Sequence, residues 1–465
     1  MAAATLDLGD IQAQFGGFDR HWPVGKFFYL RWDSPAAGQA LLARLPPLAP
    51  CLHLDDLAVQ VAVNVAFTHA GLAALGLEAT VLDSLPEDFR QGMRARAPLN
   101  GDTGLNAPEH WDDAWQGAGV HAWVGAYARS AAALGEFNTG FENWLATAAG
   151  TTLVGTQDVS RFHADPARPM HIDDPASNAG KPVVLEHFGF RDGVSNPPVA
   201  GMPADGPPTG IGRQNRDGSW SPIPAGEFLL GQVDVDGEIP AGPQPESLSR
   251  NGSFMVLRKL FQDVDAFRGY LRELSARSGV SADELAARLF GRRRDGTPLV
   301  DPSTLNGFTF ADDPHGRRCP LGAHLRRANP RDSMGFETVL VDRHRILRAG
   351  ITYGAPVPHG VAQADVNGEA GQGLMFLAFN SSFAGQFEFV TQQWINFGND
   401  QGQGNDRDPI VGVQMAPARM VIPGDGLRPT VVCAGLPQFV RLRGGDYFFL
   451  PGIAAVAALS GGATG

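Results

Sequence analysis

The order of secondary-structure elements along residues 1–160 is the feature that most restricts the fold of this chain. Strands are indicated where apolar residues alternate or run together, as in KFFYLRW, and helices where apolar residues recur at helical spacing. The first helix has a clear start, because Ser34 is a suitable N-cap and Pro35 fits the first turn. The expected elements are a strand at 26–32, a helix at 33–45, a strand at 57–67, a short helix at 68–76, a strand at 120–128, a helix through about 148 and a strand at 151–157.

A similar order follows in the C-terminal part of the chain. Val264, Phe267 and Leu271 share one face of an expected helix, and the next helix begins with a capping box at Ser281 and Glu284. The expected elements are a strand at 252–260, helices at 262–274 and 281–290, a strand at 373–380, a helix at 383–396 and a hairpin at 439–451 that turns at Gly444-Gly445.

Both parts match the ferredoxin-like order of strands and helices. We therefore expect an α+β protein with two ferredoxin-like domains, in which helices pack on antiparallel sheets. The N-terminal domain comprises residues 1–185 and the C-terminal domain residues 251–465. Residues 186–250 contain a stretch too rich in Pro and Gly for regular elements, so we expect a connector there.

The composition excludes several classes of protein. Hydrophobic residues make up 43% of the chain and charged residues 18%, which is typical of a soluble globular protein. The 37 Lys and Arg are outnumbered by 49 Asp and Glu, and we expect the densest cationic run, GRRRDG at 291–296, to be a solvated loop. Nucleic acid is therefore not an expected partner. Without a visible signal peptide or a long apolar run, we expect a cytoplasmic protein that binds no membrane, with its oligomeric state open.

The stretch EHFGFRDGVSNPP, residues 186–198, places an acid between two glycines. A turn is the simplest interpretation, because Gly189 and Gly193 accept positive φ and Asp192 can bond to its own backbone. Turn statistics alone favour this interpretation.

Two further segments combine residue types that suggest a binding site. CPLGAHLRRANPRD, residues 319–332, places three arginines within seven residues after His324. A surface cluster would explain them, but haem would also do so, because it supplies two propionates and an iron that takes a neutral imidazole nitrogen. RHRILRAGITYG, residues 343–354, places Arg348 between an apolar pair and Gly350, which an edge strand explains equally well.

These three segments resemble, in order and spacing, motifs of the dye-decolorising peroxidase family. FGFRDGVSNP is similar to the family's G-x-x-D-G signature, HLRRANPR to its H-x-R-x-x-N-P-R segment, and ILRAGITYG to its distal-arginine segment. Weaker matches, such as DLGDIQ near the start and DYFFLPGI near the end, extend the resemblance over nearly the whole chain. The segment lengths are most similar to the large fungal-like and cyanobacterial-like branch.

The resemblance implies a peroxidase with haem b held mainly by the C-terminal domain. Such an enzyme reduces hydrogen peroxide and oxidises organic donors, such as phenolics and anthraquinone-type dyes, in one-electron steps through a ferryl intermediate. The haem would be non-covalent, because the three cysteines are scattered and no C-x-x-C-H motif occurs. The alternative is a protein of the same fold that binds or transfers haem or releases its iron.

The resemblance also implies roles for single residues. They are His324 as the proximal iron ligand, Asp192 as the distal acid, Arg348 as the distal arginine, Arg331 as a propionate partner, and Gly189 and Gly193 as positions where the backbone approaches the porphyrin closely.

Two features remain open in the sequence. The acidic partner expected for the proximal histidine would set the basicity of that ligand. The position that matches the family's acid holds Ser382, the nearest acid is Glu388, and Asp312 and Asp313 are other candidates. For donor oxidation at the surface, Trp394 and Tyr353 are candidates, although core packing is the expected role of each.

Overall fold

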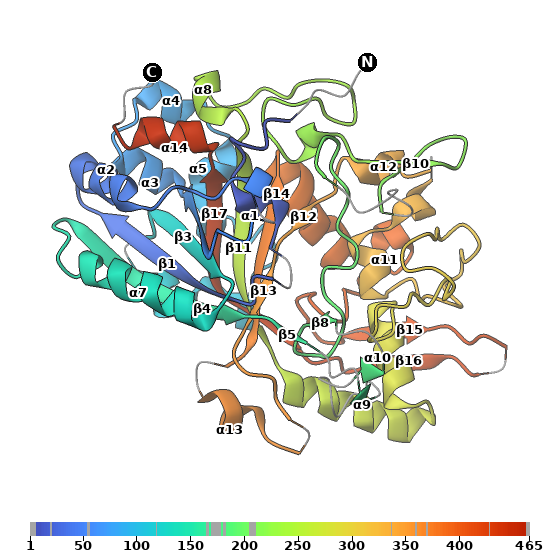
Figure 1. Cartoon of the computed structure of the whole chain (residues 1–465). Helices are drawn as coiled ribbons and strands as arrows, with labels where there is room; N and C mark the ends of the chain where they lie inside the picture. The colour runs from blue at the N-terminus through green and yellow to red at the C-terminus, as the bar shows by residue number, and fades with distance from the viewer. Residues whose placement is uncertain are drawn as a thin grey trace.

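Among the residues that the computed structural model describes, nine strands form one sheet (Figure 1). The described residues are 6–461 without 19–20, 54–55, 118, 164–166, 169–177, 180–182, 204–210, 336, 359, 369–370 and 427. Neighbouring strands of the sheet pair antiparallel, which confirms the expected α+β class. The strands are β1 (Val24–Trp32), β2 (Val61–Phe67), β3 (Ala122–Ala128), β4 (Thr151–Ser160), β11 (Ser253–Gln262), β12 (Leu347–Arg348), β13 (Ile351–Tyr353), β14 (Gly373–Asn380) and β17 (Val440–Leu450).

The sheet consists of two halves with the same strand order. The N-terminal half contributes β2-β3-β1-β4, and the C-terminal half contributes β12-β14-β11-β17 with β13 also beside β14. The halves join where Phe449 of β17 pairs with Phe67 of β2, so their sheets are continuous. At the far ends, the Thr352 hydroxyl on β13 donates a hydrogen bond to the Ser160 carbonyl on β4. The sheet therefore curves round on itself, which protects strand edges that would otherwise be unpaired.

The helices begin where the sequence signals predict. The hydroxyl of Ser34 accepts a hydrogen bond from the Ala37 amide (3.3 Å), and that of Thr68 accepts one from Gly71 (3.0 Å). The helices are α1 (Ala13–Gly16), α2 (Pro35–Arg44), α3 (His69–Ala74), α4 (Ala79–Asp83), α5 (Glu87–Ala95), α6 (Asp113–Gln116), α7 (Ala131–Leu145), α8 (Glu246–Ser249), α9 (Val264–Ser278), α10 (Ala282–Phe290), α11 (His324–Ala328), α12 (Val339–Asp342), α13 (Gln363–Asn367) and α14 (Ile453–Leu459). In the described part of the chain, none of them combines the length and apolar character needed to cross a bilayer.

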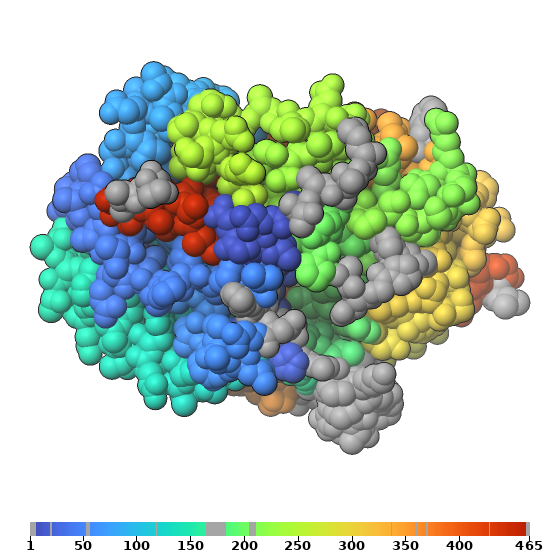
Figure 2. Space-filling model, turned by 45° about the horizontal axis from the view of Figure 1, so that its top comes forward, coloured from blue at the N-terminus to red at the C-terminus, as the bar shows by residue number. Residues whose placement is uncertain are grey.

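The helices gather at two ends of the molecule. Helices α2, α3 and α7 lie beside the N-terminal strands, whereas α9, α10 and α11 lie at the opposite end (Figure 1). Helix α14 returns to the N-terminal half, where it lies beside the first residues of the chain (red beside blue in Figure 2). There, the amides of Ile453 and Ala454 donate to the backbone carbonyl (2.8 Å) and the side chain (2.7 Å) of Asp10. Segments far apart in the sequence thus stabilise the same part of the molecule.

The hairpin expected at residues 439–451 does not form, because β17 is one continuous strand. Gly444 and Gly445 have φ angles of 138° and 145°, which favour glycine, but they lie within the strand instead of at a turn. A Cβ on Gly444 would lie 2.0 Å from the Trp115 ring, and one on Gly445 would lie 1.9 Å from the Leu257 carbonyl oxygen. The glycines therefore allow close packing on both sides of the strand.

The helix expected at 383–396 forms with π-helical turns, η7 (Phe383–Phe387) and η8 (Val390–Ile395). The Ser382 hydroxyl caps its start by accepting a hydrogen bond from the Gly385 amide (3.0 Å). Turns of this kind often occur near functional sites. Residues of this helix line the cavity described below.

Glu227 is a buried carboxyl in the connector, 5% exposed, whose Oε1 accepts a hydrogen bond from the Val235 amide (3.1 Å). Burial raises the pKa of Glu227 to about 7, and the charges of Asp234 and Asp236 add to this effect. The unfolded chain releases this proton at lower pH than the folded protein, so the free energy of unfolding falls as pH rises from about 4.5 to about 7.

We expect Glu227→Gln to remove this dependence on pH. The amide cannot ionise, yet its oxygen can still accept from Val235. Relative to the wild type, the variant should gain about 2 kcal/mol or more in free energy of unfolding between about pH 5 and about pH 8. Denaturant titrations of both proteins at these two pH values measure the gain. Parallel pH profiles would contradict the assignment.

Candidate active site

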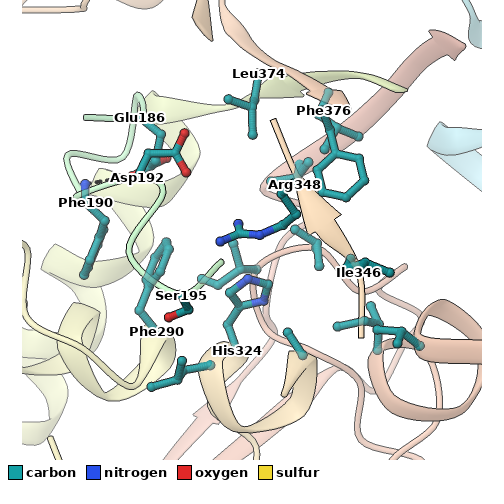
Figure 3. Close-up of a pocket in the computed structure, with 18 of the residues that line it drawn as sticks. Glu186, Phe190, Asp192, Ser195, Phe290, His324, Ile346, Arg348, Leu374 and Phe376 are labelled. Atoms are coloured by element: carbon teal, nitrogen blue, oxygen red, sulfur yellow. Dashed lines mark hydrogen bonds between the residues drawn. The ribbon is translucent and has the colours of Figure 1, made fainter. Parts of the chain in front are cut away.

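A cavity of about 320 Å³ opens between the sheet of the C-terminal half and α11 (Figure 3). This volume is within the range of about 300–1,000 Å³ that is common for small-molecule and cofactor sites. Strands β11, β12 and β14 form one wall, and α11 with residues 410–413 forms the opposite wall. Asp102 and Asn106 are the lining residues that come from the N-terminal half. The C-terminal half and the connector thus supply almost all of the cavity wall.

His324 is the first residue of α11, and its ring lies on the wall opposite β12. The ring Nδ1 lies 2.9 Å from Oδ2 of Asp408, a side chain with no exposed surface. Burial alone would raise the pKa of Asp408, but its electrostatic interaction and hydrogen bond with His324 and the nearby charge of Arg327 outweigh burial and lower that pKa. Because an ionised carboxylate only accepts, Nδ1 is the donor, and Nε2 is the ring nitrogen left for a ligand.

Asp408 is thus the acidic partner of the histidine, whereas Ser382 and the three acids considered from the sequence have other positions. Ser382 caps η7, and Asp312 is exposed. Glu388 accepts hydrogen bonds from Arg96 and from the Tyr447 hydroxyl, and Asp313 accepts them from the Arg318 and Cys319 amides. Asp408 follows the π-helical segment in the stretch NDRDPIVG, and the amides of Ile410 and Val411 both donate to its Oδ1 (2.9 Å each). The sequence did contain a signal for a structured position here, because an Asp can accept hydrogen bonds from the amides two and three residues later.

The arginines that follow His324 are buried and mostly hold loops. Arg326 donates to the carbonyls of Asp313 and Cys319, and Arg327 donates to the carbonyl of Ile395. The surface cluster that was one interpretation of this segment is therefore wrong.

Arg331 is 1% exposed, and its Nη1 donates to the carbonyls of Asn306 and Phe308. Its Nε and Nη2 have no partner among the described residues, and it is not one of the residues that line the cavity. Burial lowers the pKa of Arg331, and the charges of Arg292 and Arg345 lower it further. A buried cation with two unpaired N–H groups creates a demand for an anion nearby.

Asp192 and Arg348 both line the cavity, from different elements (Figure 3). Asp192 lies on the loop that follows β8 (Val184–Leu185), and its Oδ1 accepts a hydrogen bond from the Gly193 amide (2.7 Å). Arg348 lies on the edge strand β12, as one interpretation of the sequence expected, and its guanidinium points into the cavity towards His324. Asn196 joins the two elements, since its amide donates to the Arg348 carbonyl (2.6 Å).

The two glycines beside Asp192 have φ angles of 87° at Gly189 and 72° at Gly193. Both are therefore required by the turn itself. Gly193 lines the cavity, and Gly189 does not. Of these two glycines, Gly193 is therefore the one at which the backbone can approach a ligand in the cavity.

The run GRRRDG is not the solvated loop that the sequence indicated, because Arg292 and Arg294 are 8% and 6% exposed. Arg292 donates to Ser195 of the Asp192 loop (3.0 Å) and to Asn306 (2.7 Å). Arg294 donates to the Phe188 carbonyl. Arg294 also pairs with the Asp283 carboxylate (3.1 Å). Both guanidinium groups are thus buried because they bind acceptors from several segments, and a local charge pattern does not reveal such partners.

Cations outnumber acids at the Arg348 end of the cavity. Arg345, 6% exposed, lines it and donates to the carbonyl of Ile211 (2.7 Å). Burial lowers the pKa of Arg345 to about 10, and the charge of Arg348 also lowers it. Apolar side chains, among them Leu374 and Phe376, form another part of the wall (Figure 3). The arrangement suits a flat apolar molecule with anionic groups.

Trp394 and Tyr353 are each 2% exposed, so neither is a surface residue. Trp394 packs edge-on against the His344 ring, with ring centroids 5.5 Å apart. Tyr353 lies beneath the ammonium group of Lys259, 4.9 Å from the ring centroid. The expected core packing is confirmed for both.

Comparison with known proteins identifies the family. A model of the DyP dimeric alpha+beta barrel domain matches residues 53–155. A dye-decolorizing peroxidase of Mycetinis scorodonius is 31% identical over 489 aligned residues, which cover 98% of this chain and 88% of the relative. The chain belongs to the dye-decolorising peroxidase family. It is therefore a peroxidase, as the motifs indicated.

Solved structures of dye-decolorising peroxidases have the same overall fold. A structure of an ancestral D-type enzyme has a TM-score of 0.77 and 26% identity, and covers 97% of this chain and 99% of its own. Another, determined as a complex with 2,6-dimethoxyphenol, has a TM-score of 0.76 and 26% identity, and covers 98% of this chain and 100% of its own. The fungal relative agrees with the branch expected from the segment lengths.

Proposed function

We propose that this peroxidase binds haem b non-covalently in the cavity between His324 and Arg348 and uses it to reduce hydrogen peroxide. The observation that carries the proposal is the convergence of His324, Asp192 and Arg348 on one cavity. In this proposal the two halves are ferredoxin-like domains, and the C-terminal one holds most of the haem. When bound, haem would supply the iron that receives peroxide and the oxidising equivalents passed to organic donors.

The donor set fits this group. His324 has one ring nitrogen held by Asp408 and the other facing the cavity, which is the arrangement that fixes a metal-binding imidazole. Arg345 would meet a propionate at the cavity wall, and Arg331 is the second candidate because its Nε and Nη2 lack partners among the described residues. Gly193 would leave room for the porphyrin beside Asp192.

Asp192 and Arg348 would have different roles in the reaction with peroxide. Heterolysis of the O–O bond moves a proton from one oxygen to the other, so a group must accept it and return it. Asp192 has an Oδ2 that accepts no hydrogen bond from the described residues, and it can hold that proton. Arg348 is permanently cationic and would stabilise the negative charge on the departing oxygen.

The reductants that we propose are small phenols and anthraquinone-type dyes, each giving one electron at a time. A related enzyme binds 2,6-dimethoxyphenol, which supports the first class. A haem carrier or an iron-releasing protein needs the ligand His324 but has no use for an acid and an arginine on the opposite face. The presence of both Asp192 and Arg348 at the cavity therefore favours the peroxidase.

Reconstitution of the purified protein with haemin tests the proposal. We expect a Soret band that changes within seconds of adding one equivalent of hydrogen peroxide and returns to the resting spectrum when 2,6-dimethoxyphenol is added. An unchanged band after peroxide would indicate a carrier instead. Loss of the band with release of iron would indicate the iron-releasing alternative.

A further inference from the structure

The loop that carries Asp192 is a turn closed by its own backbone. The Glu186 amide donates to the Phe190 carbonyl (3.0 Å), and the Gly189 amide donates to the Glu186 carbonyl (2.8 Å). On leaving the turn, the Asp192 amide donates to the Val184 carbonyl (3.0 Å). The position of Asp192 in the cavity therefore depends on the shape of residues 186–190.

The side chain of Glu186 occupies the centre of this turn. Its Oε1 accepts the Phe190 amide (2.8 Å), and its Oε2 accepts the Phe188 amide (2.9 Å) and the side-chain amide of Gln262 on β11. Three N–H donors thus converge on one carboxylate at the cavity wall. Charge-assisted hydrogen bonds of this kind are stronger than those between neutral groups.

Arg294 makes a second set of contacts with the same turn. Arg294 donates to the Phe188 carbonyl and lies 4.9 Å from the centroid of the Phe190 ring, while the Arg191 amide donates to the Arg294 carbonyl (2.8 Å). Glu186 thus binds two amides of the turn, and Arg294 binds one of its carbonyls.

The two carboxylates of the loop have opposite surroundings. Both oxygens of Glu186 are engaged by N–H donors, whereas Asp192 accepts from the Gly193 amide on Oδ1 only. Burial and the charge of Asp192 raise the pKa of Glu186, and the three donors oppose that rise. N–H donors thus occupy three of the about four acceptor sites of the Glu186 carboxylate, whereas Asp192 has one oxygen that accepts nothing from the described residues and is the carboxylate better placed to take a proton.

We propose that Glu186 is a positioning residue for Asp192: its carboxylate is the template around which the turn forms, and it fixes where Asp192 enters the cavity. The inference rests on the proposed role of Asp192 as the group that accepts the proton of peroxide. It requires the amides of Phe188 and Phe190 to be protected by Glu186 whether or not haem is bound.

The test variant is Glu186→Gln, which keeps the volume and one acceptor oxygen but turns an N–H group towards at least one N–H donor. Hydrogen exchange of the haem-free protein, measured by mass spectrometry, reports how well the amides of the turn are protected, independently of catalysis. We expect exchange in the peptide containing residues 186–196 to become about tenfold faster or more, because an amide loses its partner. After haem is loaded, we expect the stopped-flow rate with peroxide to fall by about tenfold or more, because a general base acts only from the correct position.

Glu227→Gln is the matched control. Glu227 is also a buried glutamate that accepts a backbone amide of the connector, yet it is not among the residues that line the cavity. This variant should leave the exchange of residues 186–196 and the peroxide rate within about twofold of the wild type. Equal losses of peroxide rate in both variants would show a merely structural effect and overturn the proposal.

A third variant, Asp192→Asn, separates the two inferences. If it loses about 10²-fold or more in peroxide rate while Glu186→Gln stays within about twofold of the wild type, the positioning role is wrong and the role of Asp192 stands. If Asp192→Asn itself keeps the wild-type rate, the proposed role of Asp192 fails. Fast exchange of residues 186–196 together with a slow peroxide reaction in Glu186→Gln supports the positioning role.

Discussion

Replacing His324 by alanine is expected to give a folded protein that does not retain haem. His324 offers an imidazole nitrogen that faces the cavity while its second nitrogen is held by an ionised carboxylate, and the alanine variant would leave Asp408 buried without this partner. The ratio of Soret to protein absorbance after reconstitution should fall by about tenfold or more. Added imidazole should partly restore the band, because it can occupy the space left by the side chain.

His344→Ala is the control for this experiment. His344 also lines the cavity, but its ring is stacked on Phe389 with centroids 3.7 Å apart, and its Nδ1 lies 2.6 Å from the Gly385 carbonyl. We expect this variant to keep an imidazole-ligated Soret spectrum. Retention of that spectrum in His324→Ala would place the iron ligand elsewhere.

Replacing Arg348 by leucine should slow the reaction with peroxide by about 10²–10³-fold, which is the usual cost of removing one donor to a developing negative charge. Leucine removes the charge and the N–H groups, and the backbone bonds to Asn196 do not depend on the side chain. Stopped-flow measurement of the Soret change at several peroxide concentrations gives the rate constant. Haem content should stay close to that of the wild type.

Arg348→Lys is the informative companion to the leucine variant. It keeps a positive charge but loses the planar fork, so its rate should lie between those of the wild type and Arg348→Leu. If all three proteins react at the same rate, Arg348 does not act on peroxide. If both variants lose haem, its main partner is a propionate.

Local signals in the sequence were sufficient for most of the fold. Ser34, Thr68 and Ser281 cap helices at the predicted positions, because a cap is decided by neighbouring residues. Gly444 and Gly445 led to the wrong prediction of a hairpin, because that prediction also used neighbouring residues alone. A turn and a close approach both favour glycine, and only the distant Trp115 ring and the neighbouring strand distinguish them.

The three motifs of the candidate site could be predicted from the sequence, but the residues that hold their side chains in position could not. His324, Asp192 and Arg348 lie in one cavity, as the resemblance implied. Asp408, the partner of His324, lies 84 residues further along the chain, and no local pattern joins the two. The charge pattern indicated solvated side chains at Arg292 and Arg294, yet their acceptors include Ser195 and the Phe188 carbonyl, which are about 100 residues away in the sequence, and the Asp283 carboxylate. Such pairings are properties of the tertiary structure.

The pairing of Phe449 with Phe67 and the docking of α14 beside Asp10 have a consequence for the biosynthesis of the enzyme. These contacts join residues from nearly opposite ends of the chain, and forming them requires closure of a very long loop. During translation, the N-terminal half emerges first but lacks the strand that covers the edge of β2 until β17 has been made. Closure of the sheet therefore has to wait for the synthesis of β17, and the interval before it is when the nascent chain most needs protection from aggregation.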